Sequence, residues 1–247
     1  MKWAASLLLL LTSLAAFAYE DAMPDVNIVV DLTKAGKKVA PPTPGHPVFY
    51  YPKMAPYTEE GAVFANDQPP PPPNAIAHEL AVALARQGYL VAVGKHRPDI
   101  VLAIIYGSIN PVYVSVPGPA RHKSAQVMLN QTDMVAMVQG NDVHGLDVAW
   151  IRKQILDQLH YNRYFFMVTA LDFNTFGPGK DPVILWRARI SIPAIHVYFG
   201  DVVKTLIDKG VPFFGRDARP QHIEIPTVPE GHVEVGTPTP KNPQPAQ

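Results

Sequence analysis

The chain has 247 residues, 47% of them hydrophobic, and its 21 basic and 21 acidic residues give a formal net charge of zero. This size allows one large or two small domains, and the balanced charge gives no indication of nucleic acid as a partner. The chain has no cysteine, which excludes disulfides, thiol catalysis and a lipidated N-terminal cysteine.

The N-terminus has the parts of a secretory signal peptide. Lys2 is a short basic region, an apolar stretch follows up to Phe17, and residues 16–18 form an A-x-A cleavage site. We expect cleavage after Ala18, which leaves residues 19–247 as an exported, periplasmic or secreted chain without a transmembrane span. A retained membrane anchor is the less favoured interpretation, because the apolar stretch is short for a bilayer.

Residues 19–73 are predicted to contain two strands and a proline-rich loop. The strands are residues 26–32 and residues 48–51, and the second is expected to stop at Pro52. Residues 69–73 are five consecutive prolines, which favour a stiff extended segment. A spacer is preferred there over a docking site for a proline-binding domain.

Residues 74–110 show the strongest local pattern of the chain. Asn74 is a suitable N-cap, residues 75–87 are predicted to be helical, and Gly88 supplies the stop. A short strand over 89–93 and a turn over 94–99 should follow. Residues 100–106 are apolar without alternation, which indicates a strand buried on both faces near the sheet centre. The apolar stripe of the helix consists of Ile76, Leu80 and Leu84.

The second half repeats this order after a loop or edge strand over 110–120 and an ambiguous stretch over 121–140, which could be two strands or one poor helix and for which an insertion with a helical start is favoured. Residues 148–161 should form a helix capped by Asp147, and residues 163–173 and 183–192 a β-hairpin. A last helix is expected up to Gly210. Residues 217–247 are rich in proline and polar residues, which is typical of a disordered tail.

These elements predict an α+β fold with a mixed, mostly antiparallel sheet and helices packed on one face. Residues 74–216 would be its core, with residues 19–73 completing the same domain. The order helix, strand, turn, strand occurs over 74–110 and again over 147–192, so we also predict a duplicated αββ unit.

Five short motifs carry a resemblance to a known group of proteins. The sequence resembles uncharacterised exported bacterial envelope proteins with a domain of unknown function, many of whose relatives are lipoproteins. The resemblance implies an α+β fold and an envelope location, and it implies no catalytic residues. Lipid anchoring does not carry over, because this chain lacks cysteine. The motifs lie at residues 87–89, 98–102, 163–165, 171–173 and 185–187, the last followed by Ser191.

One histidine has acidic neighbours. His144 lies between Asp142 and Asp147, and a turn leading into a helix cap explains this cluster better than a metal ion. No metal-ligand, phosphate-loop or nucleophile motif is present elsewhere, and the sequence indicates no cofactor.

The remaining candidate site is a pair of arginines. Residues 183–192 alternate, so Arg187 and Arg189 share the face of a strand opposite its apolar side chains. Arginines on a central strand require water, an acid or a ligand, and Asp172 on the partner strand is the predicted acid. An ion-paired sheet face is favoured over an anion site.

The absence of every catalytic motif tested favours a non-enzymatic binding or scaffold module that meets another protein or an envelope polymer. The alternative is a hydrolase or small-ligand-binding protein whose site is assembled from distant residues. A pocket that brings together Ser108, His144 and Arg187 would favour this alternative.

Overall fold

The structure, a computed structural model, describes residues 25–62, 69–116, 125–140, 153, 156–195 and 197–224. All of them belong to one contact unit, Pro24–Glu224. The predicted signal peptide over residues 1–18 lies outside the described residues, so export remains a prediction.

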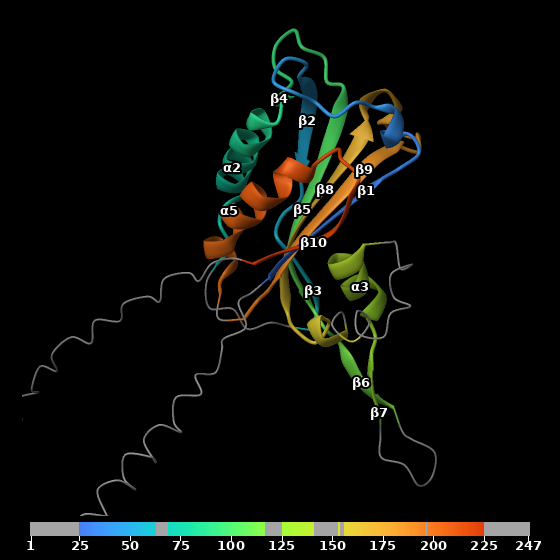
Figure 1. Ribbon diagram of the computed structural model, residues 1–247, viewed down its shortest axis with the longest axis vertical. Helices are drawn as coiled ribbons and strands as arrows, with labels where there is room; N and C mark the ends of the chain where they lie inside the picture. The colour runs from blue at the N-terminus through green and yellow to red at the C-terminus, as the bar shows by residue number, and fades with distance from the viewer. Residues whose placement is uncertain are drawn as a thin grey trace, which may run out of the picture. The chain divides into compact units, whose positions relative to one another are not determined.

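A mixed, twisted sheet forms the centre of the fold (Figure 1). Its middle strands are antiparallel to one another, whereas three pairs toward one edge, β2–β4, β2–β5 and β3–β5, are parallel. The prediction of an α+β fold with a mixed sheet is confirmed. In spatial order the strands are β10 (Ala218–Glu224), β1 (Asp25–Leu32), β9 (Ile184–Pro193), β8 (Arg163–Asp172), β5 (Ile100–Asn110), β2 (Val48–Met54) and β4 (Tyr89–Val91), and β3 (Thr58–Gly61) pairs with β5.

Two helices, α2 (Pro73–Arg86) and α5 (Phe199–Gly210), pack together on one face of the sheet. We call this the helical face; it carries the apolar side chains of β9, and a Cβ on Gly210 of α5 would lie 2.1 Å from Ile190. The predicted stripe Ile76, Leu80 and Leu84 is buried. Burying each such side chain stabilises the fold by about 1.5–3 kcal/mol.

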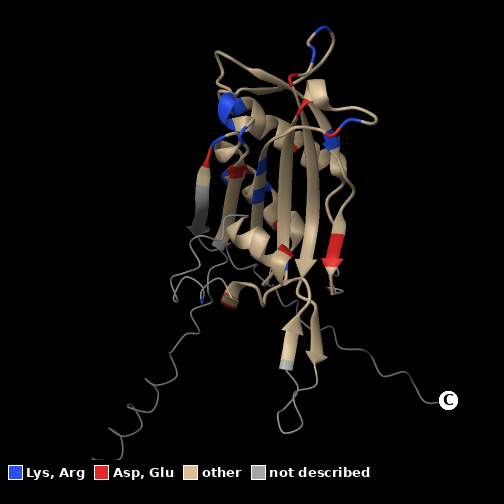
Figure 2. Cartoon of the chain, turned by 90° about the vertical axis from the view of Figure 1, so that its right-hand side faces the viewer, with Lys and Arg blue, Asp and Glu red and all other residues tan. Residues whose placement is uncertain are grey.

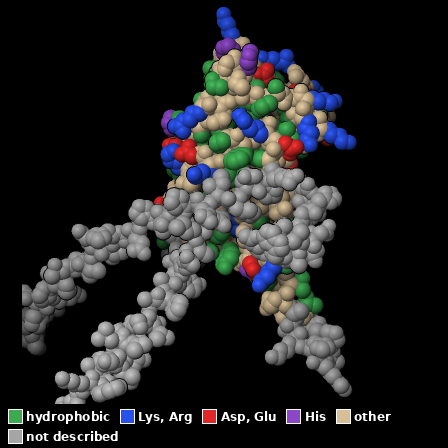
Figure 3. Space-filling view, viewed as in Figure 1, with side chains coloured by type: hydrophobic (Ala, Val, Ile, Leu, Met, Phe, Trp, Pro, Cys, Tyr) green, Lys and Arg blue, Asp and Glu red, His purple; other side chains and the backbone are tan. Residues whose placement is uncertain are grey.

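The outer surfaces of α2 and α5 carry ion pairs that contribute little to stability because they are exposed. Lys204 lies 3.7 Å from Glu79, and Arg86 lies 3.7 Å from Asp208. Figure 3 shows this intermixing of basic and acidic side chains over the helices. The outer surfaces of the two helices therefore carry charges of both signs rather than a field of a single sign.

The opposite face, which we call the open face, carries Arg187 and Arg189. One end of it is covered by α3 (Gln131–Gln139), which contacts β1 and β9. Met134, Met137 and Val138 of α3 form a small apolar cluster there with Phe165. The other end, around Arg187, is half-buried.

The predicted duplication of an αββ unit is wrong. β8 and β9 do form the expected hairpin, but β4 and β5 do not pair, because β2 lies between them and is parallel to both. β2 also continues through Pro52 to Met54. Its pairing with β4 ends at Tyr50, so Pro52 faces a free edge on that side, where its missing N–H is not needed.

The start of α2 and the last strand also differ from the predictions. The N-cap of α2 is Pro72 rather than Asn74, whose side chain accepts a hydrogen bond from the backbone N–H of Ala75 inside the first turn. Gly88 does end this region with a φ of 89°. The first residues of the predicted tail form β10, because they pair with β1, and residues 225–247 lie outside the described residues.

The ambiguous stretch over 111–146 contains a projecting hairpin followed by a helix. β6 (Tyr113–Val116) pairs with β7 (Ala125–Met128), and α3 comes after them, so the helical start that we favoured is wrong. Of the helix predicted over 148–161, residues 156–158 are helical, and most of its first half lies outside the described residues.

Candidate functional site

Five residues from five neighbouring strands form one row across the open face. Strand register places Lys53 opposite Ala103, Ala103 opposite Thr169, Thr169 opposite Arg187, and Arg187 opposite Asp31. Facing residues on neighbouring strands point to the same side, and strands lie roughly 4.8 Å apart. The row from Lys53 to Arg187 therefore spans roughly 14 Å, three strand spacings, with two small side chains between its cations.

Arg189 has an acidic partner on β1. Its guanidinium donates a short hydrogen bond to the carboxylate of Asp31. The side chain of Arg189 is 4% exposed and that of Asp31 is 31% exposed, so the cation of this ion pair is buried and its anion is accessible to solvent. Such a pair is costly to break, because removing the acid leaves a charge in a site that water hardly reaches.

Arg187 is less fully neutralised than Arg189. Its Nε donates a hydrogen bond of 3.2 Å to the hydroxyl of Thr169. Burial lowers the pKa of Arg187, the positive charge of Arg189 lowers it further, and Asp31 acts in the opposite direction. The Asp31 carboxylate therefore acts on both guanidinium groups.

The predicted acid Asp172 has a different role. It lies at the end of β8, where its carboxylate accepts hydrogen bonds from the backbone N–H and the side-chain amide of Asn174. Asp172 therefore stabilises the turn that follows β8, and the structure gives Arg189 the partner Asp31 instead. The fourth predicted residue, His144, lies outside the described residues.

Sequence reasoning missed Asp31 and Lys53. Both belong to strands that were predicted or nearly predicted, but their position in one row with Arg187 follows from strand order, for which the sequence offers no local signal. Asp31 and Asp172 are each an acid near the end of an apolar strand. β1 places Asp31 opposite Arg187, whereas β8 places Thr169 and Met167 opposite Arg187 and Arg189, so Asp172 lies farther along β8, away from both arginines.

The row can attract an anion through its two cations. Lys53 and Arg187 lie three strands apart in it, and the carboxylate of Asp31 follows Arg187 on β1. Figure 2 shows basic positions midway along strands of the sheet, where most residues are uncharged. No group of three or more histidine or acidic side chains that could hold a metal ion occurs among the residues that the structure describes.

The residues named for an assembled catalytic site do not converge. Ser108 lies opposite Tyr164 and Ile192 on the helical face, so the sheet separates it from Arg187. Neither the pocket beside Tyr57 nor the smaller one beside Trp186 has Arg187 in its lining. Within the described part of the chain, no helix is both long and apolar enough to cross a membrane.

No protein-family profile and no curated protein matches the sequence. Several solved structures are similar in outline. A PDZ domain protein from Parabacteroides distasonis has a TM-score of 0.40 at 11% identity over 86% of this chain, which spans 42% of that protein.

Two further structures are similar to a smaller share of this chain but over most of their own length. PelC from Paraburkholderia phytofirmans, a dodecamer, has a TM-score of 0.34 at 12% identity over 78% of this chain and 98% of its own. A DUF4136 family protein from Bacteroides thetaiotaomicron has a TM-score of 0.33 at 11% identity over 75% and 91%. At these scores the likeness carries no conclusion about function.

Proposed function

We propose that this protein is a non-enzymatic, exported binding module of the bacterial envelope and that it holds an anionic polymer on its open face. The observation that carries the proposal is the row across the sheet, in which Lys53 and Arg187 are separated by Ala103 and Thr169. The export step rests on the signal-peptide pattern of residues 1–18.

The shape of the row favours an extended ligand. Its cations lie on a sheet surface roughly 14 Å apart, which suits a chain that passes over several strands rather than a small molecule. The small side chains of Ala103 and Thr169 leave the space between the cations shallow. Arg187 is half-buried and held by Thr169, so it loses little side-chain freedom when an anion binds.

Binding to a carboxylated polysaccharide tests the proposal. The full chain would be titrated with polygalacturonate, and with uncharged dextran as the reference polymer. Arg187→Gln and Lys53→Gln should each weaken polygalacturonate binding by roughly twofold to fivefold, as for the loss of one partly screened ion pair. Added salt should weaken binding in the unchanged protein, because exposed charges are screened.

Lys209→Gln is the matched control, since Lys209 is an exposed cation near the end of α5 on the other side of the sheet. If Lys209→Gln weakened polygalacturonate binding as much as Arg187→Gln does, the polymer would be attracted by overall charge, which would contradict a site on the open face. Equal binding of dextran and polygalacturonate would also contradict it. If the chain bound an acidic protein but not the polymer, and both Arg187→Gln and Lys53→Gln weakened that binding, the ligand of the open face would be a protein rather than a polysaccharide.

A further inference from the structure

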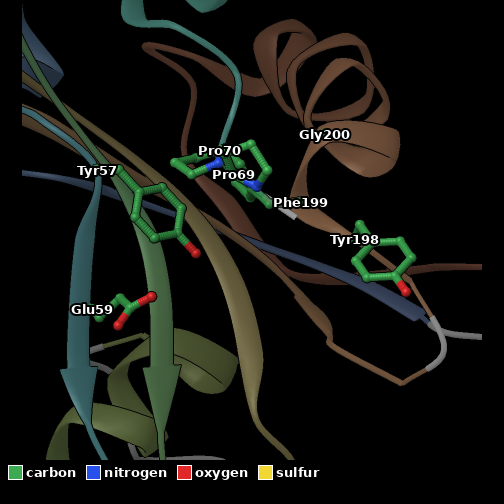
Figure 4. A pocket seen from close by; sticks show the side chains of 7 residues that line it. All are labelled: Tyr57, Glu59, Pro69, Pro70, Tyr198, Phe199 and Gly200. Carbon is green, nitrogen blue, oxygen red and sulfur yellow. The ribbon is translucent and has the colours of Figure 1, made fainter. Parts of the chain in front are cut away.

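A second site lies on the helical face, near the start of α5. A pocket of about 140 Å³ opens between β3, the first residues of α5 and two of the prolines that precede α2. Figure 4 shows the hydroxyl of Tyr57 and the carboxylate of Glu59 directed toward the same space, with Pro69 and Pro70 across from them. Tyr198 lies at the far side of the opening.

The strand pattern explains why Tyr57 and Glu59 point into the same pocket. They are two residues apart on or beside β3, so their side chains share one side of the strand. Glu59 is opposite Ser108, which belongs to the helical face. Gly107 allows β3 to approach closely, because a Cβ there would lie 1.8 Å from the carbonyl oxygen of Thr58.

The walls of the pocket are aromatic and fixed by the core. Phe199 is buried and stacks on Tyr106 with 5.8 Å between the ring centroids. Tyr57 meets the edge of Phe199 at 5.4 Å. Pro69 and Pro70 add a stiff apolar wall, since proline fixes the backbone.

The pocket carries a negative charge. Glu59 takes part in no ion pair among the residues that the structure describes. Burial raises the pKa of Tyr57, the Ser108 hydroxyl lowers it, and the Glu59 carboxylate raises it further. The first turn of α5 borders the pocket, but the acid Asp201 offsets the partial positive charge of that helix end.

We propose that this pocket binds the quaternary ammonium group of a small organic cation. Aromatic rings and a carboxylate attract a cation, and Glu59 disfavours an anion. A primary ammonium is compact and strongly hydrated, so it loses more hydration than a quaternary ammonium on entering a pocket walled by aromatic side chains and prolines. A quaternary ammonium requires no hydrogen bonds and can lie against the accessible rings of Tyr57 and Tyr198. This site is distinct from the row on the open face and does not depend on the function proposed for it.

Three probes of similar size test the proposal on the full chain. Choline carries the quaternary charge, 3,3-dimethylbutan-1-ol has the same shape without charge, and ethanolamine carries a primary ammonium. Choline should bind with saturation, shift the NMR signals of the Tyr57 ring, and bind roughly threefold to thirtyfold more tightly than the neutral alcohol. Ethanolamine should bind more weakly than choline.

Glu59→Gln should lower choline affinity by roughly threefold to tenfold. Glu60→Gln removes the same charge from the next residue of β3, which points to the other side of the strand, and should leave the affinity unchanged. Equal binding of choline and the neutral alcohol would overturn the proposal. So would choline shifts that fail to saturate, or equal losses for the two glutamate variants in proteins with unchanged circular dichroism.

Discussion

Replacing Asp31 by asparagine should destabilise the fold by leaving the buried guanidinium of Arg189 without this counter-charge. Breaking a fully buried ion pair costs about 3–5 kcal/mol. Arg189 is 4% exposed, but Asp31 is 31% exposed, so water reaches one end of the pair and part of the cost is recovered. We therefore expect a loss of about 2–3 kcal/mol in the free energy of unfolding.

A double-mutant cycle separates this effect from the general cost of mutation. Arg189→Met should cost about 1 kcal/mol, because it leaves only a partly hydrated carboxylate, and adding Asp31→Asn to it should cost little more. Urea unfolding, followed by the fluorescence of buried Trp186, measures all three variants. Asp217→Asn is the control, because its ion pair with Lys37 is more than half exposed at both ends and should contribute less than about 1 kcal/mol.

The reasoning would be refuted if the effects of the two substitutions on the free energy of unfolding were additive. If the two single changes sum to the double change within about 0.5 kcal/mol, then Asp31 and Arg189 do not stabilise each other. The same conclusion would follow if Asp31→Asn cost no more than Asp217→Asn. Either result would place the counter-charge of Arg189 elsewhere on the open face.

Three further changes test the core and the strand edges. Leu84→Ala should cost about 2–5 kcal/mol in urea unfolding, because Leu84 is fully buried, whereas Val82→Ala on the exposed side of α2 should cost under about 1 kcal/mol. Gly107→Ala should cost about 1–3 kcal/mol by pushing β3 away; unchanged stability would contradict the close approach. Burial raises the pKa of Tyr50 from about 10 to about 12, so stability present below pH 10 should be lost as the pH rises through 12. Tyr50→Phe should reduce that loss.

The sequence predicted elements whose signals are local. Alternation over 183–192 placed Arg187 and Arg189 on one face, and the continuous apolar run from Ile100 marked the central strand β5. The stripe of α2 was also correct. In each case one or both sides of a single element are buried, and this burial determines the spacing of apolar residues within a short stretch of sequence.

Strand order could not be predicted because it is not local. The sequence from Tyr89 to residue 106 reads as two strands joined by a turn, and an antiparallel hairpin was the natural inference. The structure instead inserts β2 between them, since Tyr50 pairs with Val91 of β4 on one side and with Ile100 of β5 on the other. The pocket was missed for the same reason: its residues come from three separate stretches of the chain.

Strand register links the two faces of the sheet. Neighbouring residues of the same strands serve opposite faces, so Arg187 lies on the open face while Trp186 lies in the core. A shift of one residue would exchange these roles and bury an arginine among aromatic rings. The irregularity between β8 and β9 falls after Ala170, beyond the Thr169–Arg187 pair. The part of the β8–β9 hairpin that contains Thr169 and Arg187 is therefore regular. Burial of the apolar side chains on the helical face fixes this register, and the same register places the charged side chains on the open face.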